Sequence, residues 1–295
     1  MHFFGGRRRP GKIFTIVAVA MTAIIPAKSS LAEDKFTETT HLMAIGICPP
    51  WKRQDAEACR RSVDSVEAAL TARLGIADEN VTTLLNAAAT TEGLKAAFAG
   101  LSGLGPNDRL IIYANLHAGG LDPTAQVGPD NDVFVLWTKD KPAALQFAVA
   151  EGDWIMASDF AAWVHALPVG EVIFILDACE SGAVTPLFID AHPSDDGSRP
   201  EAVIVSASAD QFANFTADKS VALYSQQLAQ TLASTKGTFR HAADLAAEQT
   251  HDAVIAICDL QKSSLEQAGI DPSSCLQQPT THDPDALLTH IVLRD

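Results

Sequence analysis

The sequence is poor in basic residues, and its main part has no long apolar run. It holds 21 Lys and Arg against 36 Asp and Glu in 295 residues, a formal net charge of −15. This balance argues against broad electrostatic binding to nucleic acid. After residue 25, no apolar run reaches the roughly 20 residues that a membrane-spanning helix needs. Because 47% of the residues are hydrophobic and only 19% are charged, we expect a folded chain with ample core.

Motifs for common cofactors and for several hydrolase classes are also missing. The sequence has no Cys-x2-Cys or His-Glu-x2-His spacing, no Gly-x-Gly-x2-Gly or phosphate-binding loop, and no Gly-x-Ser-x-Gly. We therefore expect neither a metal nor an organic cofactor.

The N-terminal segment has the pattern of a secretory signal peptide. Arginines at 7–9 precede an apolar run at 13–25, and Ser-Leu-Ala at 30–32 fits a cleavage site. We expect residues 1–32 to be removed and residues 33–295 to form one exported domain, periplasmic or extracellular, without stable membrane insertion. An uncleaved anchor is the alternative. Residues 1–32 hold five basic residues and no acid, so their removal changes the net charge from −15 to −20.

Short apolar runs alternate with helical patterns along the rest of the chain. Strands that are apolar throughout and separated by helices are typical of a mainly parallel sheet covered on both faces. We therefore expect an α/β three-layer sandwich with a six-stranded sheet, and a small inserted β-hairpin at 133–149. The predicted strands are 41–47, 81–85, 109–116, 171–176, 202–207 and 287–293. The predicted helices are 59–74, 158–167, 221–233 and 239–258, with Ser158 and Ser220 as N-caps.

Two of these strands end in residues with catalytic potential. One runs into Asp-Ala-Cys-Glu-Ser-Gly at 177–182, and an earlier one ends in His-Ala-Gly-Gly at 117–120. Ligands of parallel α/β sheets bind beyond the carboxyl ends of the strands, so neighbouring strands would bring Cys179 and His117 face to face there. An imidazole beside a thiol can take its proton, so the pair predicts a nucleophile and a general base. The candidate oxyanion donors are the backbone N–H groups of Ala118, Gly119 and Cys179.

These motifs resemble the caspase-like cysteine proteases, and within them the metacaspases and their bacterial relatives. In that family one strand ends in a His-Gly turn and the next in Asp-x-Cys-x-Ser-Gly, which residues 177–182 fit in full. The resemblance implies a caspase-like sandwich and a cysteine endopeptidase acting on peptides or proteins. It makes Cys179 the nucleophile and His117 the general base and acid.

The resemblance also suggests a substrate preference. Asp177 lies where metacaspase-like proteins place an acid in the pocket for the side chain before the cleaved bond, which implies cleavage after Arg or Lys. Arg60 and Arg61 keep cleavage after Asp open, since an arginine fork suits a carboxylate. Further candidates for lining this pocket are Asn115, Asp64 and Asp210, and a solvated or helix-face role is an equal alternative for each of them.

Two departures from the family pattern leave alternatives open. Alanine at 118 replaces the family's glycine, so a catalytically inactive homologue that acts as a binding or scaffold module is the leading alternative. The segment after the nucleophile strand, 186–200, is short and offers a poor cutting site, so we expect a single-chain enzyme without processing. A hydrolase of another amide, such as a cell-wall peptide, is a third possibility.

The five cysteines leave one thiol over after complete pairing. The simplest arrangement joins two local pairs, Cys48 with Cys59 and Cys258 with Cys275, and leaves Cys179 as a thiol. Some metacaspases use calcium, and that alternative stays open for this chain. The acids at 190, 195 and 196 are interpreted as solvated loop residues and not as its ligands.

Overall fold

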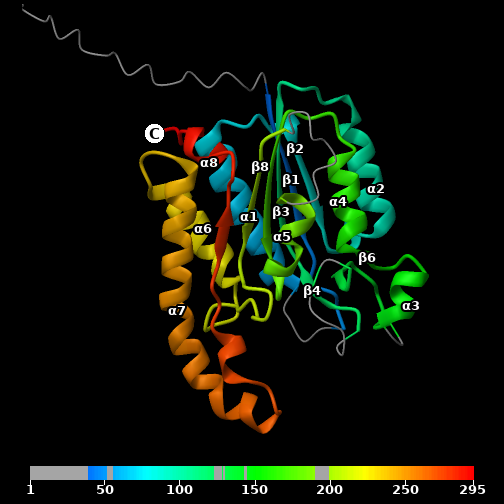
Figure 1. Ribbon diagram of the computed structural model, residues 1–295, viewed down its shortest axis with the longest axis vertical. Helices are drawn as coiled ribbons and strands as arrows, with labels where there is room; N and C mark the ends of the chain where they lie inside the picture. The colour runs from blue at the N-terminus through cyan, green and yellow to red at the C-terminus, as the bar shows by residue number, and fades with distance from the viewer. Residues whose placement is uncertain (1–38, 52–55, 123–127, 129, 143–144, 190–198) are drawn as a thin grey trace, which may run out of the picture. The chain divides into compact units, whose positions relative to one another are not determined.

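The fold is built around a six-stranded sheet (Figure 1). The computed structural model describes residues 39–295 except for 52–55, 123–127, 129, 143–144 and 190–198. The strand order is β2-β1-β3-β7-β8-β9, in which only β9 runs antiparallel to its neighbour. The predicted mainly parallel six-stranded sheet is therefore confirmed. Its strands are β1 (Thr39–Gly46), β2 (Val81–Leu85), β3 (Asp108–Asn115), β7 (Glu171–Asp177), β8 (Glu201–Val205) and β9 (Thr280–His282).

The middle residues of the central strands are apolar because both faces of the sheet are covered. Side chains along a strand alternate between the two faces. In β3, Leu110 and Ile112 belong to one buried cluster, whereas Ile111 and Tyr113 belong to the other. All seven residues of β7 are buried.

Helices form the two outer layers. The cluster on one face includes residues of α2 (Thr91–Gly100), α4 (Ala157–His165) and α5 (Thr185–Ile189). The cluster on the other face includes residues of α1 (Ala56–Leu74) and α6 (Leu223–Ser234). These layers form the expected three-layer α/β arrangement (Figure 1). The second face is also covered by α7 (Phe239–Gln267) and α8 (Leu287–His290).

Both predicted serine caps are wrong. The N-caps of α4 and α6 are Met156 and Ala222, and neither side chain makes a capping hydrogen bond. Threonines cap two other helices instead. Thr90 accepts from the backbone N–H of Gly93 in α2, and Thr238 accepts from that of His241 in α7.

The prediction of a strand at 287–293 is also wrong. Residues Leu287–His290 form α8, and only Val292 makes an isolated bridge, to Thr238. Asp283 accepts the N–H of Leu288, which favours a helical turn here. The sixth strand is β9, whose sequence Thr-Thr-His is short and partly exposed, so it carries no apolar signal.

In place of the predicted hairpin at 133–149, the structure has a small antiparallel sheet built from other segments of the chain. Its strands are β4 (His117–Gly120), β5 (Asp132–Val135) and β6 (Ile155–Met156), in that order. The expected second arm is helix α3 (Leu145–Ala150), in keeping with the helix propensity of leucine and alanine. This small sheet follows directly from β3 and carries His117 at its start.

The structure contains both expected local disulfides. Cys48 and Cys59 join the end of β1 to α1, and their Cα atoms are 5.9 Å apart. Cys258 and Cys275 join α7 to a short 3₁₀ turn at a Cα distance of 5.6 Å. The predicted signal peptide and the acids at 190, 195 and 196 lie outside the described residues. Within the described residues, no helix is long and apolar enough to cross a membrane.

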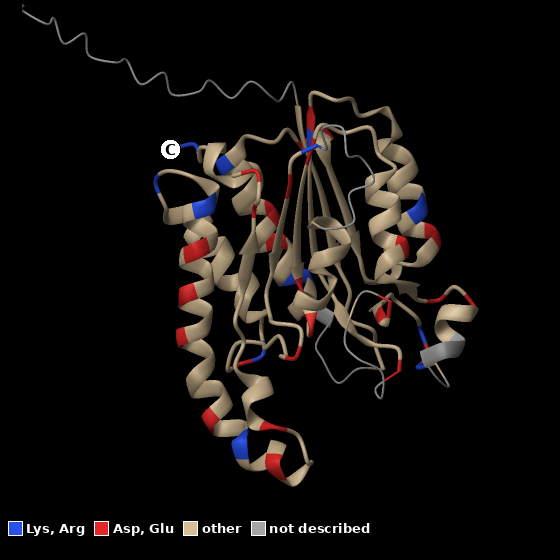
Figure 2. Cartoon of the chain, in the orientation of Figure 1, with Lys and Arg blue, Asp and Glu red and all other residues tan. Residues whose placement is uncertain are grey.

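Acidic residues recur along α7 (Figure 2). Asp244, Glu248 and Asp252 are four residues apart and exposed, so they share one face of the helix. The acidity of the chain therefore lies in part on a helix of the outer layer.

Candidate active site

The sheet brings the two motif-bearing strand ends together. Strands β3 and β7 are neighbours and parallel, with Asn115 opposite Asp177 at their carboxyl ends. His117 lies two residues beyond the first, and Cys179 two residues beyond the second. The neighbour relation on which the expected pairing depends is thus present.

His117 and Cys179 line two cavities at this edge. A small cavity of about 40 Å³ also contains Asn115, Asp177 and Asn214 in its wall. A larger cavity of about 410 Å³ lies on the β4 side, and the pair are the only lining residues that the two cavities share. The pair therefore lies where the two cavities meet.

A third cavity, of about 540 Å³, shares part of its wall with the small one. Both are lined by residues 213–215, and the third cavity also contains Arg61 and Ser220 in its wall. The small cavity thus adjoins a space large enough for a long side chain.

The motif around Cys179 packs against the loop that follows β8. The half-buried thiol lies outside both disulfides, and its Sγ is 3.9 Å from the backbone oxygen of Ala213. Ser181 Oγ donates to the oxygen of Ala207 at 3.2 Å and accepts that residue's N–H at 3.0 Å. A Cβ at Gly182 would lie 2.8 Å from the nitrogen of Ala209, so this close approach requires glycine. The Ser-Gly of the motif therefore anchors the loop that carries Cys179.

Asp177 points beneath α6. Its buried carboxylate accepts from the N–H of Ser225 at 3.1 Å and from its hydroxyl at 2.5 Å, and Tyr113 joins the same network. Burial raises the pKa of Asp177, although the hydrogen bonds from Ser225 and Ser206 oppose the shift. The carboxyl oxygen Oδ1 has no hydrogen-bond partner. Asp177 is thus an acid in the wall of the small cavity with one unused acceptor.

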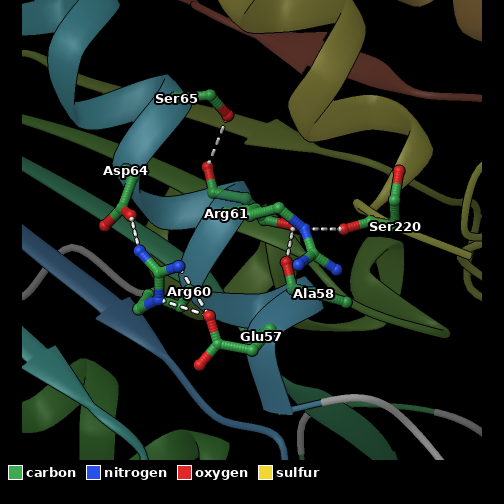
Figure 3. A network of polar contacts seen from close by, with 8 residues as sticks. Glu57, Ala58, Arg60, Arg61, Asp64, Ser65 and Ser220 are labelled. Atoms are coloured by element: carbon green, nitrogen blue, oxygen red, sulfur yellow. Dashed lines mark hydrogen bonds and ion pairs between the residues drawn. The ribbon is translucent and has the colours of Figure 1, made fainter.

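Of the other predicted pocket residues, only Asn115 reaches these cavities. Its buried Nδ2 donates to the backbone oxygen of Asp177 at 3.2 Å and so joins the two strand ends. Asp64 instead accepts from Arg60 at 2.6 Å on the exposed face of α1 (Figure 3). Asp210 is exposed, and neither aspartate lines the two cavities at Cys179.

Arg60 and Arg61 of α1 also differ in position, since one lies on the exposed face and the other lines a cavity. Arg60 also binds Glu57 on the exposed face, whereas Arg61 Nε donates to the backbone oxygen of Ser220 at 2.6 Å (Figure 3). Only Arg61 lines the 540 Å³ cavity.

The backbone of β4 distinguishes between the candidate oxyanion donors. The N–H of Leu121 donates to Asn131 on the β5 side, and that of Gly120 bonds to the carboxylate of Glu180 on the other side. Because N–H directions alternate along a strand, Ala118 directs its N–H to the side of Glu180, whereas Gly119 faces β5. Gly119 is therefore poorly placed for the predicted role. Ala118 is not among the residues with positive φ, so alanine fits here without strain.

Glu180 and Asp132 form an acidic pair that the sequence analysis missed. Burial raises the pKa of Glu180, and burial together with the charge of Glu180 raises the pKa of Asp132 to about 6. Neither carboxyl oxygen of the buried Asp132 has a hydrogen-bond partner. Glu180 occupies a variable position of the motif, and Asp132 follows a loop, so neither gives a recognisable sequence signal.

The described residues contain no group of three or more His, Cys, Asp or Glu that could hold a metal ion. The site is therefore described by its thiol, imidazole, carboxyl and backbone groups.

Comparisons with known proteins bear on the fold. No protein-family model matches the chain, and neither does any curated protein sequence. Protein GSU0716 from Geobacter sulfurreducens is 16% identical, with a TM-score of 0.51, over 87% of this chain and 100% of that one. Caspase-1 from Spodoptera frugiperda is 12% identical, with a TM-score of 0.44, over 83% and 85% of the two chains. The chain thus shares the fold of the Geobacter protein.

Proposed function

We propose that this chain is an exported, caspase-like cysteine endopeptidase that uses Cys179 and His117. The observation that carries the proposal is their common position in the walls of two cavities, beyond the carboxyl ends of adjacent parallel strands. Nucleophile and base must lie within reach of the same substrate bond, and the shared cavity walls support that arrangement.

The chemistry follows from these groups. His117 takes the thiol proton, and the thiolate of Cys179 adds to the substrate carbonyl. The N–H groups of Ala118 and Cys179 stabilise the oxyanion. The C–N bond then breaks as His117 gives its proton to the leaving amine. Water, deprotonated by His117, hydrolyses the remaining thioester and restores the thiol.

A preference for Arg or Lys before the cleaved bond is supported by Asp177. Its carboxyl lines the small cavity with one unpartnered oxygen. A long basic side chain has room in the adjoining space of about 540 Å³. Arg61 in that space supports the rival preference for Asp.

An activity assay with a matched variant tests the proposal. The protein without residues 1–32 is incubated with fluorogenic peptides ending in Arg, Lys or Asp, beside Cys179→Ala. We expect hydrolysis after Arg or Lys, and a loss of at least about 10³-fold in kcat/KM in the variant. Equal rates for both proteins would disprove the catalytic assignment.

A labelling experiment separates an enzyme from an inactive homologue. A thiol-reactive peptide analogue should modify Cys179 selectively and at a saturable rate. A protein that binds the peptide but shows no selective reaction at Cys179 would instead be a binding module. Release of cell-wall fragments without cleavage of the peptides would indicate another amide as substrate.

Export is supported by the two disulfides, because disulfides persist in oxidising compartments. Mass measurement of the protein recovered from its native location tests this point. We expect a chain that begins at residue 33. An intact N-terminus on a membrane-bound protein would favour the anchor.

A further inference from the structure

The cavity on the β4 side of the catalytic pair has a composition of its own. Its wall contains the indole rings of Trp51 and Trp154, which are stacked with centroids 6.1 Å apart and planes at 24°. It also contains the carboxylate of Glu180. Its volume of about 410 Å³ suits a large side chain.

The position of this cavity relates it to one half of a substrate. The scissile bond must lie at Cys179 and His117, which are the only residues shared with the small cavity. If the residue before the bond enters on the side of Asp177, the chain after the bond must leave on the β4 side. The 410 Å³ cavity therefore faces the leaving half of the substrate.

The charge in the cavity is held in place. The carboxylate of Glu180 accepts the N–H of Gly120, and the N–H of Glu180 donates to the oxygen of Gln211 at 2.8 Å. Lys141 also lines the wall, but it is exposed. Solvent screens an exposed charge more than a half-buried one, so Glu180 acts on a bound side chain more strongly than Lys141 does.

This combination suits a cation on an aliphatic stem. The stems of Lys and Arg pack along apolar surfaces while the charged end seeks a carboxylate, and indole faces attract cations. A neutral side chain would leave the half-buried carboxylate without such a counter-charge.

We propose that the 410 Å³ cavity binds the residue immediately after the cleaved bond and selects Lys or Arg there through Glu180. This inference rests on the proposed peptidase function. Together with Asp177, it describes an enzyme that cuts between two basic residues.

Internally quenched peptides measure the selection directly. The residue before the bond is fixed to the best one found, and the residue after it is Lys, Gln or Glu. Mass spectrometry identifies the products, so that only cleavage at the intended bond is counted in the rate. We expect kcat/KM for Lys to exceed that for Gln by about tenfold, and Glu to be poorest.

Three variants assign the effect to the carboxylate. Glu180→Gln keeps a hydrogen-bond acceptor for Gly120 but removes the charge, so the Lys-to-Gln ratio should fall to about one. Glu180→Asp keeps the charge and should retain a preference for Lys. The control Glu248→Gln, on the exposed face of α7, should leave the ratio unchanged. An unchanged ratio in Glu180→Gln overturns the proposal.

A fluorogenic peptidyl amide distinguishes this inference from the proposed function, since it has no amino acid after the bond. If the wild-type protein hydrolyses the amide but shows no preference among the three peptides, the inference is wrong and the peptidase function stands. If it hydrolyses neither kind of substrate, both are wrong.

Discussion

Among single residues, Glu180, which follows Cys179, has an unusual backbone conformation. Glu180 has φ 56° and ψ 17°, a left-handed conformation that favours glycine. Two hydrogen bonds hold it there, from its N–H to Gln211 and from Gly120 to its carboxylate. Strain of this kind persists only where the surroundings fix it, and here it directs Glu180 toward β4.

The buried acid beside Glu180 should make stability depend on pH. Burial raises the pKa of Asp132 from 3.8 to about 6, so the folded protein binds a proton that the unfolded chain has lost. The free energy of unfolding therefore falls as pH rises from about 4 to about 6. Asp132→Asn should reduce this fall by an amount on the order of 2 kcal/mol.

Urea unfolding at several pH values checks this prediction. The difference between wild type and Asp132→Asn reports the titration of this carboxyl together with its coupling to Glu180. Parallel stability curves for the two proteins over this range would show that Asp132 titrates normally.

Alanine at position 118 should not limit activity. Its φ is not positive and its N–H already points to the Glu180 side, so glycine offers no geometric gain. We expect Ala118→Gly to change kcat by less than about threefold and to lower stability by about 0.5–1 kcal/mol. A large rise in kcat, measured with the best fluorogenic peptide, would show that alanine impairs the oxyanion site.

Single residues differ in how far the sequence could identify them. Cys179 and His117 were recognisable because each follows an apolar strand within a motif of small residues. Asp64 was placed in the pocket by resemblance, but its ion pair with Arg60 keeps it on the outer face of α1. The role of Glu180 depends on a contact with β4 that local sequence cannot predict.

Among elements, the loop after β7 depends on one close approach. A methyl group at Gly182 would meet the backbone of residues 207–209 at 2.8–3.1 Å, whereas one at Gly100, the last residue of α2, meets nothing within 4 Å. Gly182→Ala should therefore shift the nucleophile's loop, cost about 1–3 kcal/mol and lower kcat/KM.

The control Gly100→Ala should be neutral or slightly stabilising in the same unfolding experiment. Equal stability and kcat/KM for the two variants would show that the loop tolerates a side chain at 182.

The strength of the local pattern decided which elements could be predicted. β7 and β8 contain unbroken apolar runs, at 172–176 and 202–205, so their existence follows from the sequence. The sixth strand was misplaced because α8 is apolar and short while β9 is polar, and only tertiary packing distinguishes them. The cavity walls could not be predicted, because Trp51, Trp154 and Glu180 come from distant parts of the chain.

On the scale of the whole molecule, the sheet separates a structural end from a reactive end. At the amino ends of β3 and β7, Arg109 lies opposite Glu171 and donates from Nε at 2.7 Å, with both side chains buried. The candidate site lies at the opposite, carboxyl ends of the same strands.

Breaking this buried pair should destabilise the fold without altering the chemistry. Glu171→Gln removes the carboxylate that is paired with the buried guanidinium of Arg109, so we expect a loss of about 3 kcal/mol in the free energy of unfolding. The value of kcat at 25 °C should stay within about twofold, because no catalytic group moves. The exposed Glu92→Gln serves as the control in both measurements. A strong loss of kcat in a folded Glu171→Gln protein would mean that the two ends are coupled.

The small antiparallel sheet has a consequence for how such a protein can diversify. β5 pairs with β4, β6 pairs with β5, and neither contributes a strand to the main sheet. Insertions or exchanges in the segment between β4 and β6 would therefore reshape one wall of the larger cavity and leave the six-stranded sheet in register. That wall can vary during evolution without moving Asp177 or Cys179, whereas Glu180 cannot be exchanged independently of the loop that carries Cys179.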